Sequence, residues 1–153
     1  MSDDLQIWYL APLRKCNLNC SYCATGQPNI TDKDMWQKGT GIDHHKAILQ
    51  WISNLDRKIS IRINTIGEPF ISDEYMQSLA ELSHSDNIKF VEILTNATFT
   101  KKKFDQFIKS AIAEKITLWA TFHHESVSIK KITENVQYAI NSGAKAFLHG
   151  LVF

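Results

Sequence analysis

Residues 16–23 read CNLNCSYC and carry all three cysteines of the chain, Cys16, Cys20 and Cys23. An odd number of cysteines within eight residues cannot form the disulfide framework of a small secreted domain. The spacing instead predicts a metal or redox centre. Three thiolates on one loop can wrap a cubane iron-sulfur cluster, with each thiolate binding one iron.

A cubane held in this way has a fourth iron without a protein ligand, and an open position of that kind can bind a reacting molecule. Structural zinc sites usually have four protein ligands and paired CxxC knuckles. A zinc site here would need a histidine, such as His44 or His123. A 4Fe-4S cluster on the three cysteines is the preferred interpretation, and zinc is the alternative.

The rest of the chain alternates between apolar runs of strand length and stretches with helical periodicity, which is typical of parallel β/α units. The length suits one domain over residues 1–153, with an α/β fold of about five strands and four helices. The linker over residues 24–42 is long for a β/α connection and is typical of a lid, a binding loop or a disordered segment. Strands are predicted over residues 5–10, 59–64, 89–95, 116–122 and 144–152, and helices are predicted to start near Asp43, Ser72, Thr100 and Ser128.

The alternation of side chains along the strands gives the predicted sheet one apolar and one polar face. Ile59, Ile61 and Ile63 share one face of their strand, so Arg62 falls on the other. By the same count, the polar face also receives Ser60, Asn64, Glu92, Thr117, Trp119, Thr121, His123 and His149. Polar residues inside a β/α barrel suggest a lined cavity. The alternative is an ordinary ion pair between Arg62 and Glu92, with histidines that are hydrogen-bonded within the fold.

Composition sets few limits on partners. The formal net charge is +1, so there is no basic excess of the kind that binds nucleic acid phosphates. No run approaches the roughly 18 apolar residues of a membrane span, and the acidic start of the chain differs from a signal peptide. We expect a cytoplasmic protein.

The segment CNLNCSYC, with Tyr22 just before the third cysteine, resembles the cluster motif of the radical S-adenosylmethionine (SAM) superfamily. This resemblance implies a partial (β/α) barrel, a 4Fe-4S cluster and SAM as cofactors. It also implies reductive cleavage of SAM to methionine and a 5′-deoxyadenosyl radical, which abstracts hydrogen from a substrate. Tyr22 stands where the family places a residue whose backbone contacts the adenine.

The turn after the second predicted strand, Thr65-Ile66-Gly67-Glu68-Pro69, is similar to the family's Gly-Gly-Glu-Pro turn, with Ile66 in place of the first glycine. In that family the turn receives the amino group of SAM. Gly67 would allow the backbone to approach the ligand, and Glu68 would supply a carboxylate acceptor for an ammonium. Thr65 would help to orient SAM at the same turn.

Two later turns add candidate cofactor contacts. Leu94-Thr95-Asn96-Ala97-Thr98 resembles the family's Thr-Asn-Gly turn, and the alternative is that Asn96 and Thr98 only cap the next helix. Thr121 and His123 stand where the family often contacts the ribose and carboxylate of SAM. His123 is also a candidate proton donor or a structural histidine. Four further residues, His44, His45, His124 and Glu125, are expected to be exposed to solvent.

The family resemblance also implies partners. An electron donor such as flavodoxin or ferredoxin would reduce the cluster, and the substrate is left open because fold does not decide it. Family barrels typically have six β/α units, so we expect that either the chain is truncated and lacks its C-terminal barrel units, or a partner such as a second copy of the chain completes the edge of the sheet. The rival from another class is a non-catalytic iron-sulfur or zinc-binding module with an interaction or regulatory role. Glu68 is expected to separate the two, because a structural metal module has no need of a carboxylate at that turn.

Overall fold

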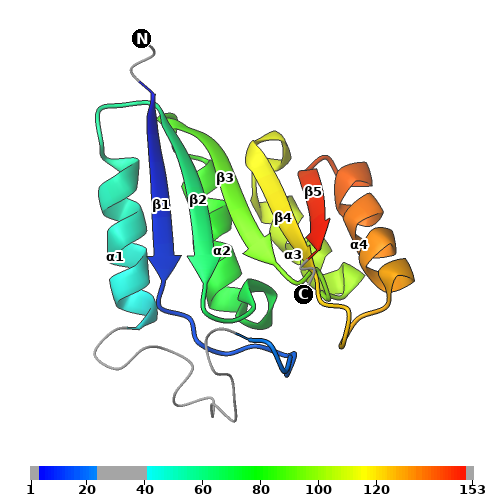
Figure 1. The fold of residues 1–153 in the computed structure, drawn as a ribbon. Coiled ribbons are helices and arrows are strands. Elements are labelled where there is room, and N and C mark those ends of the chain that lie inside the picture. The colour runs from blue at the N-terminus through cyan, green and yellow to red at the C-terminus, as the bar shows by residue number, and fades with distance from the viewer. Residues whose placement is uncertain (1–3, 24–40, 151–153) are drawn as a thin grey trace.

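Five parallel strands form one sheet in the order β1-β2-β3-β4-β5 (Figure 1). The computed structural model describes residues 4–23 and 41–150, so the linker over 24–40 and the end of the predicted fifth strand lie outside it. The strands are β1 (Leu5–Ala11), β2 (Ile59–Thr65), β3 (Ile88–Thr95), β4 (Ile116–Phe122) and β5 (Lys145–Gly150).

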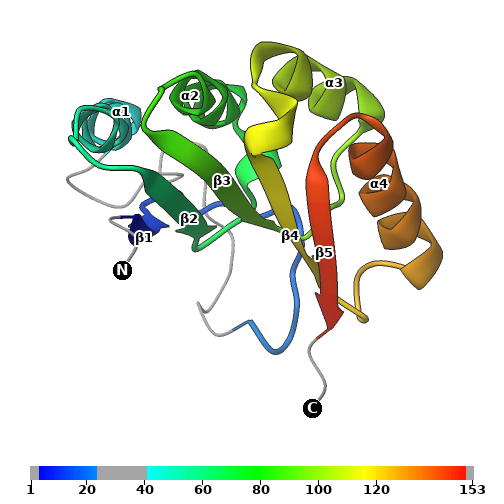
Figure 2. The ribbon, with the colours of Figure 1, turned by 90° about the horizontal axis from the view of Figure 1, so that it is seen from above.

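All four α-helices pack on the same face of the sheet (Figure 2). A sheet whose strands follow in sequence order, with every crossover on one side, curls into part of a β/α barrel. The predicted fold class is therefore confirmed. Within the described residues, no helix is both long and apolar enough to cross a membrane. The helices are α1 (Ile42–Ser53), α2 (Asp73–Ser83), α3 (Lys101–Ser110) and α4 (Ile129–Asn141), and two 3-10 helices, η2 (Pro69–Ile71) and η3 (Ala113–Lys115), precede α2 and β4.

The covered face of the sheet supplies much of the hydrophobic core. Buried side chains alternate along β2 as the sequence predicted, and on β4 Thr117 of the other face is buried as well. Each large aliphatic side chain buried here is worth about 1.5–3 kcal/mol relative to exposure. On β2 and β4, the buried residues of this face are Ile59, Ile61, Ile63, Ile116, Leu118 and Ala120.

Hydroxyl side chains begin three of the helices where the sequence predicted. The side chains of Ser72, Thr100 and Ser128 each accept a hydrogen bond from a backbone amide in the first turn. The helix predicted near Asp43 forms, but the predicted capping role of Asp43 is wrong, because Gly41 precedes α1 and Asp43 lies within its first turn. There the carboxylate interacts favourably with the helix dipole without capping an amide.

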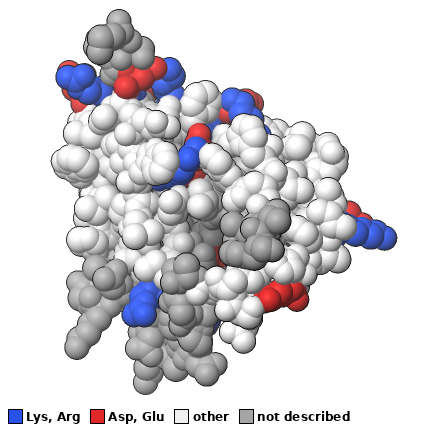
Figure 3. All heavy atoms as spheres, in the orientation of Figure 1, with Lys and Arg blue, Asp and Glu red and all other residues white. Residues whose placement is uncertain are grey.

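In the described part of the chain, the opposite face of the sheet carries no helix (Figure 2). The predicted ion pair forms here, since Arg62 Nε donates to Glu92 Oε2 at 2.6 Å. The predicted histidine contact also forms, with Thr121 Oγ1 3.0 Å from His149 Nε2. In Figure 3 this face is largely uncharged, with a positive and a negative group together over β2 and β3.

Large aromatic side chains lie exposed on this same face. Trp8 of β1 is 66% exposed and Phe147 of β5 is 59% exposed. The described residues therefore leave an open, partly aromatic surface where an enclosed cavity was predicted.

His45 is a further departure from expectation, because it is fully buried. Its ring stacks between Tyr9 and Tyr75, with centroids 5.6 and 4.4 Å away. Its Nδ1 lies 3.1 Å from the Tyr9 hydroxyl and its Nε2 lies 3.0 Å from Ser78 Oγ. His44, the adjacent residue on α1, is exposed as expected.

Burial lowers the pKa of His45 from 6.5 to about 4, and the nearby charges of His44 and Lys46 act in the same direction. The unfolded chain binds the proton more readily than the folded chain. The free energy of unfolding should therefore be greatest above about pH 6.5 and should fall as the pH drops towards 4. The full contribution of this one group is on the order of 3 kcal/mol.

We predict that His45→Gln removes this pH dependence. Urea unfolding between pH 7 and pH 4.5 should show that the wild type loses up to about 1.4 kcal/mol per pH unit more than the variant. His84→Gln is the matched control, because His84 is exposed on α2's C-terminal end and should leave the slope unchanged. Parallel curves for wild type and His45→Gln would contradict the assignment.

Candidate functional site

The candidate residues gather where the parallel strands end, at the lower edge of the sheet in Figure 1. The cysteine loop follows β1, the turn with Glu68 follows β2, Asn96 follows β3 and His123 follows β4. This is the edge at which β/α barrels assemble their active sites.

Gly67 lies in the turn after β2. Because it has no side chain, the segment that leads into the cysteine loop can pack directly against this turn. Its amide donates to the carbonyl oxygen of Leu13 at 3.2 Å, and the Glu68 amide donates to that of Lys15 at 2.8 Å. A Cβ atom at Gly67 would lie only 1.8 Å from the Lys15 carbonyl oxygen. The close approach expected towards a ligand is therefore made by the chain's own backbone. Thr65 Oγ1 donates to the Gly67 carbonyl oxygen at 2.6 Å and stiffens the same turn.

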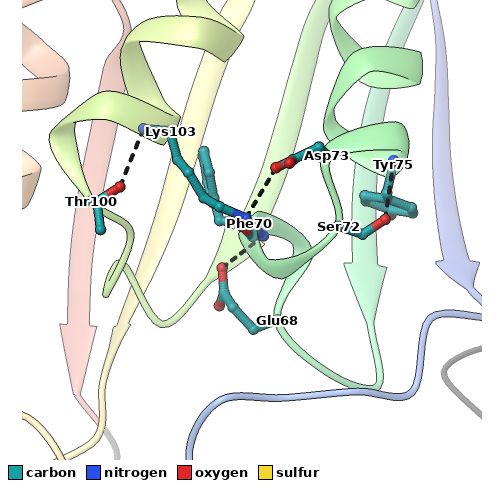
Figure 4. Close-up of polar contacts among 7 residues, drawn as sticks. All are labelled: Glu68, Phe70, Ser72, Asp73, Tyr75, Thr100 and Lys103. Carbon is teal, nitrogen blue, oxygen red and sulfur yellow. Dashed lines mark hydrogen bonds and ion pairs between the residues drawn. The ribbon is translucent and has the colours of Figure 1, made fainter. Parts of the chain in front are cut away.

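Glu68 is almost fully buried, and its carboxylate accepts three hydrogen bonds from the chain. Oε1 accepts from the Phe70 amide at 3.1 Å and from Thr95 Oγ1 at 2.7 Å, and Oε2 accepts from the Asn96 amide at 2.7 Å. In Figure 4 the carboxylate points up at the backbone of Phe70. Burial raises the pKa of Glu68 from 4.5 to about 7, although the three donors act in the opposite direction. Glu68 thus ties the turn after β2 to the turn after β3.

Lys103 lies beside the turn that carries Glu68, but its ammonium binds groups other than the Glu68 carboxylate. Its ammonium lies 3.2 Å from the Phe70 carbonyl oxygen and 3.0 Å from Asp73 Oδ1, as drawn in Figure 4. A hollow of about 220 Å³ lies between Lys103, Glu68 and Asn17. The ion pair of Lys103 is therefore with Asp73. Among the described residues, the buried carboxylate of Glu68 has no ion-pair partner.

Asn96 bridges the turn after β3 to the cysteine loop. Its Oδ1 accepts from the Thr98 amide at 3.0 Å, which fixes the side chain. Its Nδ2 donates to Asn17 Oδ1 at 2.9 Å and lies 3.8 Å from Cys16 Sγ. The capping alternative is wrong, because Thr100 caps α3. Ala97, at the family's glycine position, has a φ of 53°, the left-handed conformation that a glycine there would adopt without strain.

The sulfur atoms of Cys16 and Cys20 already lie within hydrogen-bond distance of polar groups. The Leu18 amide donates to Cys16 Sγ at 3.4 Å, while Cys20 Sγ lies 3.4 Å from His123 Nδ1 and 3.7 Å from Ser126 Oγ. Burial is the main cause that raises the pKa of the Cys16 thiol, and the Leu18 amide opposes it. Burial also lowers the pKa of His123, which favours its neutral ring.

The loop after β4 holds the other end of the cysteine loop. The Tyr22 ring stacks on His124 with centroids 5.3 Å apart, and its hydroxyl lies 3.3 Å from His123 Nδ1. Glu125 is exposed, as expected, yet its carboxylate accepts from both the amide and the hydroxyl of Ser21, at 2.9 and 2.6 Å. Sequence patterns had singled out neither Glu125 nor Ser21.

The structure therefore brings Tyr22, Glu68, Asn96 and His123 to the surroundings of the cysteine loop. Thr121 lies on the helix-free face two positions before His123, and its hydroxyl contacts His149. In residues 4–23 and 41–150, no three side chains of His, Cys, Asp or Glu are gathered closely enough to hold a metal ion.

Comparison with known proteins identifies the family. Residues 10–145 match the family model described as the Radical SAM superfamily. The chain belongs to the radical SAM superfamily. The predicted resemblance is confirmed over most of the chain's length.

Three similar proteins place this radical SAM chain among longer ones. It is 30% identical over 113 residues to "Uncharacterized protein MJ0907" of Methanocaldococcus jannaschii, covering 71% of this chain and 36% of that protein. Its fold resembles that of anSMEcpe with bound AdoMet (TM-score 0.66, 15% identity, 94% of this chain and 41% of that one). It also resembles BtrN in complex with AdoMet and 2-DOIA (TM-score 0.60, 19% identity, 98% and 57%). The chain thus spans about a third of the curated relative's length.

We predict that Gly67→Ala destabilises this radical SAM domain by about 2 kcal/mol or more, because the added Cβ would meet backbone atoms that cannot rotate away. Chemical denaturation of the purified variant would measure the loss. Gly150→Ala is the matched control, because no atom lies within 4 Å of a Cβ built there. Equal midpoints for the two variants would show that the contact with Lys15 is loose.

Proposed function

We propose that this radical SAM domain binds a 4Fe-4S cluster through Cys16, Cys20 and Cys23 and cleaves SAM reductively to methionine and a 5′-deoxyadenosyl radical. The proposal rests on one observation: hydrogen bonds connect a three-cysteine loop to the turns after β2, β3 and β4. When bound, the cluster would supply one electron and an open iron. The radical would abstract hydrogen from a substrate that the fold does not identify.

The chemistry of the cysteine surroundings fits such a cluster. A thiolate that binds iron keeps its negative charge partly on sulfur, and N–H donors stabilise that charge and influence the reduction potential. The Leu18 amide, the Asn96 amide group and the His123 ring already lie within 3.4–3.8 Å of Cys16 or Cys20 Sγ. The raised pKa of Cys16 means that iron binding would release a proton from this thiol.

In this proposal Glu68 binds the ammonium of SAM. Its Oε2 accepts one hydrogen bond from the described residues, so it has capacity for a second donor. A buried carboxylate whose pKa is raised by desolvation gains most from an adjacent positive charge, which would return its pKa towards the ordinary range. A charged hydrogen bond of this kind is worth about 1.5–3 kcal/mol.

The other candidates supply shape and further contacts to SAM. We assign the adenine to the backbone at Tyr22, whose ring is fixed by His124. We assign the ribose and carboxylate to Asn96, Thr121 and His123, and His123 is also the candidate proton donor. The hydroxyl of Thr65 is already bonded to Gly67, so it would hold the turn rather than the ligand.

Two partners belong to the same proposal. The half-buried positions of Cys16 and Cys23 would leave the cluster near the surface, within reach of a reduced flavodoxin or ferredoxin in the cytoplasm. The outer strands of the sheet, β1 and β5, would be completed by a second copy of the chain or by another protein.

One observation favours the rival candidate, a non-catalytic metal-binding module. Glu68 has a structural use in the fold, because three hydrogen bonds converge on its carboxylate. A carboxylate at this turn therefore does not by itself separate a catalytic domain from a structural one. Cluster loading and SAM turnover do separate them.

Anaerobic reconstitution tests the cluster and its reaction. We predict about four irons per chain, an electron paramagnetic resonance signal after dithionite that changes when SAM is added, and formation of 5′-deoxyadenosine. Alanine variants of Cys16, Cys20 or Cys23 should lose iron, whereas Asn19→Ala, in the same loop, should keep it. Stoichiometric zinc without iron would refute the cluster, and a full cluster without any 5′-deoxyadenosine would favour the non-catalytic module.

Substitution of Glu68 tests the ammonium site. Glu68→Gln removes the negative charge, so we predict that it keeps its iron and loses SAM affinity about tenfold or more. Thr95→Val is the matched control, because it removes a hydrogen bond to Glu68 and leaves the charge. Calorimetric SAM binding should separate the two variants. An equal loss of affinity in both would mean that Glu68 acts only by holding the turns together.

A further inference from the structure

Arg62 lies in the middle of the helix-free face, with its guanidinium between two indole rings. Its Cζ lies 4.8 Å from the centre of the Trp8 ring and 3.7 Å from that of the Trp119 ring. Both contacts are cation–π interactions. Trp8 lies on β1, which pairs with β2, and Trp119 lies on β4, which is separated from β2 by β3. The side chain of Arg62 is only 17% exposed, so its conformation is restricted by the surrounding residues.

Glu92 fixes the remaining rotation of this guanidinium but occupies only one of its edges. Its Oε2 accepts from Nε at 2.6 Å. Arginine presents five N–H donors, and the pair of terminal nitrogens forms a second edge that fits an oxyanion with two parallel bonds. Those terminal nitrogens make no hydrogen bond to any described residue. An arginine stacked on both sides and pinned at Nε is preorganised to bind with that edge.

An unsatisfied acceptor lies nearby on the same face. Asn64 follows Arg62 by two positions on β2, so both side chains leave the sheet on the same side. Its Oδ1 is buried and has no hydrogen-bond partner among the described residues. A buried acceptor without a donor costs about 1–3 kcal/mol, which a ligand N–H or O–H would recover.

We propose that Arg62 and Asn64 form a substrate subsite that binds a carboxylate at the terminal nitrogens of Arg62 and an adjacent N–H at Asn64 Oδ1. This assignment rests on the proposed function, and it narrows the substrate class to molecules with a carboxylate next to an amide or amine, such as the terminus of a peptide. Trp8 and Trp119 form the walls of the subsite.

The charge of Glu92 selects the type of anion. Its carboxylate already offsets the charge of Arg62, so a phosphate dianion would meet stronger repulsion than a carboxylate. A monoanion with two coplanar oxygens also matches the flat edge of the guanidinium.

Arg62 lies deeper along β2 than the proposed SAM contacts, whereas Asn64 lies one residue before Thr65. Arg62 lies three residues before Thr65, the last residue of β2, which is about 10 Å along an extended strand. A group bound there would lie on the wall of the barrel, below the turns that carry the proposed SAM residues.

Tryptophan fluorescence of the reconstituted, oxidised chain provides the test, with ionic strength held constant. The probe is N-acetylglycine, which has a carboxylate beside an amide N–H. We expect saturable binding, weaker binding of acetate, and no binding of N-acetylglycinamide or inorganic phosphate at the same concentrations. Tighter binding of phosphate than of N-acetylglycine would overturn the carboxylate assignment.

Two substitutions should act in opposite directions. Arg62→Lys should weaken N-acetylglycine at least about tenfold, because lysine cannot form the two parallel bonds. Glu92→Gln should tighten it about threefold or more, because it keeps an acceptor for Nε and removes the competing charge. Ser60→Ala, on the same face of β2, is the matched control and should change nothing. A loss of binding in both Arg62→Lys and Glu92→Gln would mean that the pair has only a structural role.

Addition of saturating SAM distinguishes this subsite from the SAM site. N-acetylglycine should bind equally well with and without SAM, and competition between them would place the methionyl carboxylate at Arg62 and overturn the proposal. The probe does not depend on turnover. If SAM is not cleaved but the probe binds as expected, the proposed function fails and the carboxylate subsite stands.

Discussion

Glu68 places an ionisable group in the buried interior of the fold, where the turns after β2 and β3 meet. Its carboxylate accepts hydrogen bonds from Phe70, Thr95 and Asn96, so the ends of β2 and β3 are joined through one side chain. The adjacent Gly67 fits the segment before Cys16 against this turn with no room for a side chain. The cysteine loop is therefore positioned by a buried acid on one side and by a glycine contact on the other.

Local chemistry explains how much of this could be predicted from the sequence. Period-two alternation predicted the buried face of β2 and β4, and hydroxyl residues at Ser72, Thr100 and Ser128 predicted helix starts, because those signals act within a few residues. The motif CNLNCSYC predicted the family in the same way, because three closely spaced thiolates have few other uses.

Contacts between distant segments could not be predicted by such rules. Glu125 binds Ser21 across 104 positions of the chain, and no local pattern marks either residue. His45 looked like a surface residue beside His44, and its burial depends on Tyr9 and Ser78, which only the folded sheet and helices bring together. At Glu68 the residue type was informative, but two of its three donors, Thr95 and Asn96, come from the end of β3, whose placement beside Glu68 only the tertiary structure defines.

The ties of the cysteine loop imply an order of assembly. Asn17 meets Asn96 across 79 positions, and Ser21 meets Glu125 across 104, so the loop reaches its shape only when the chain from β1 to the end of β4 has folded. In zinc fingers the metal brings its ligands together and so creates the fold. Here non-local contacts already hold the cysteine loop, so we expect inorganic iron and sulfide to enter a folded domain and to draw the three thiolates together. The stability of the apoprotein would then limit how much holoprotein a cell can mature.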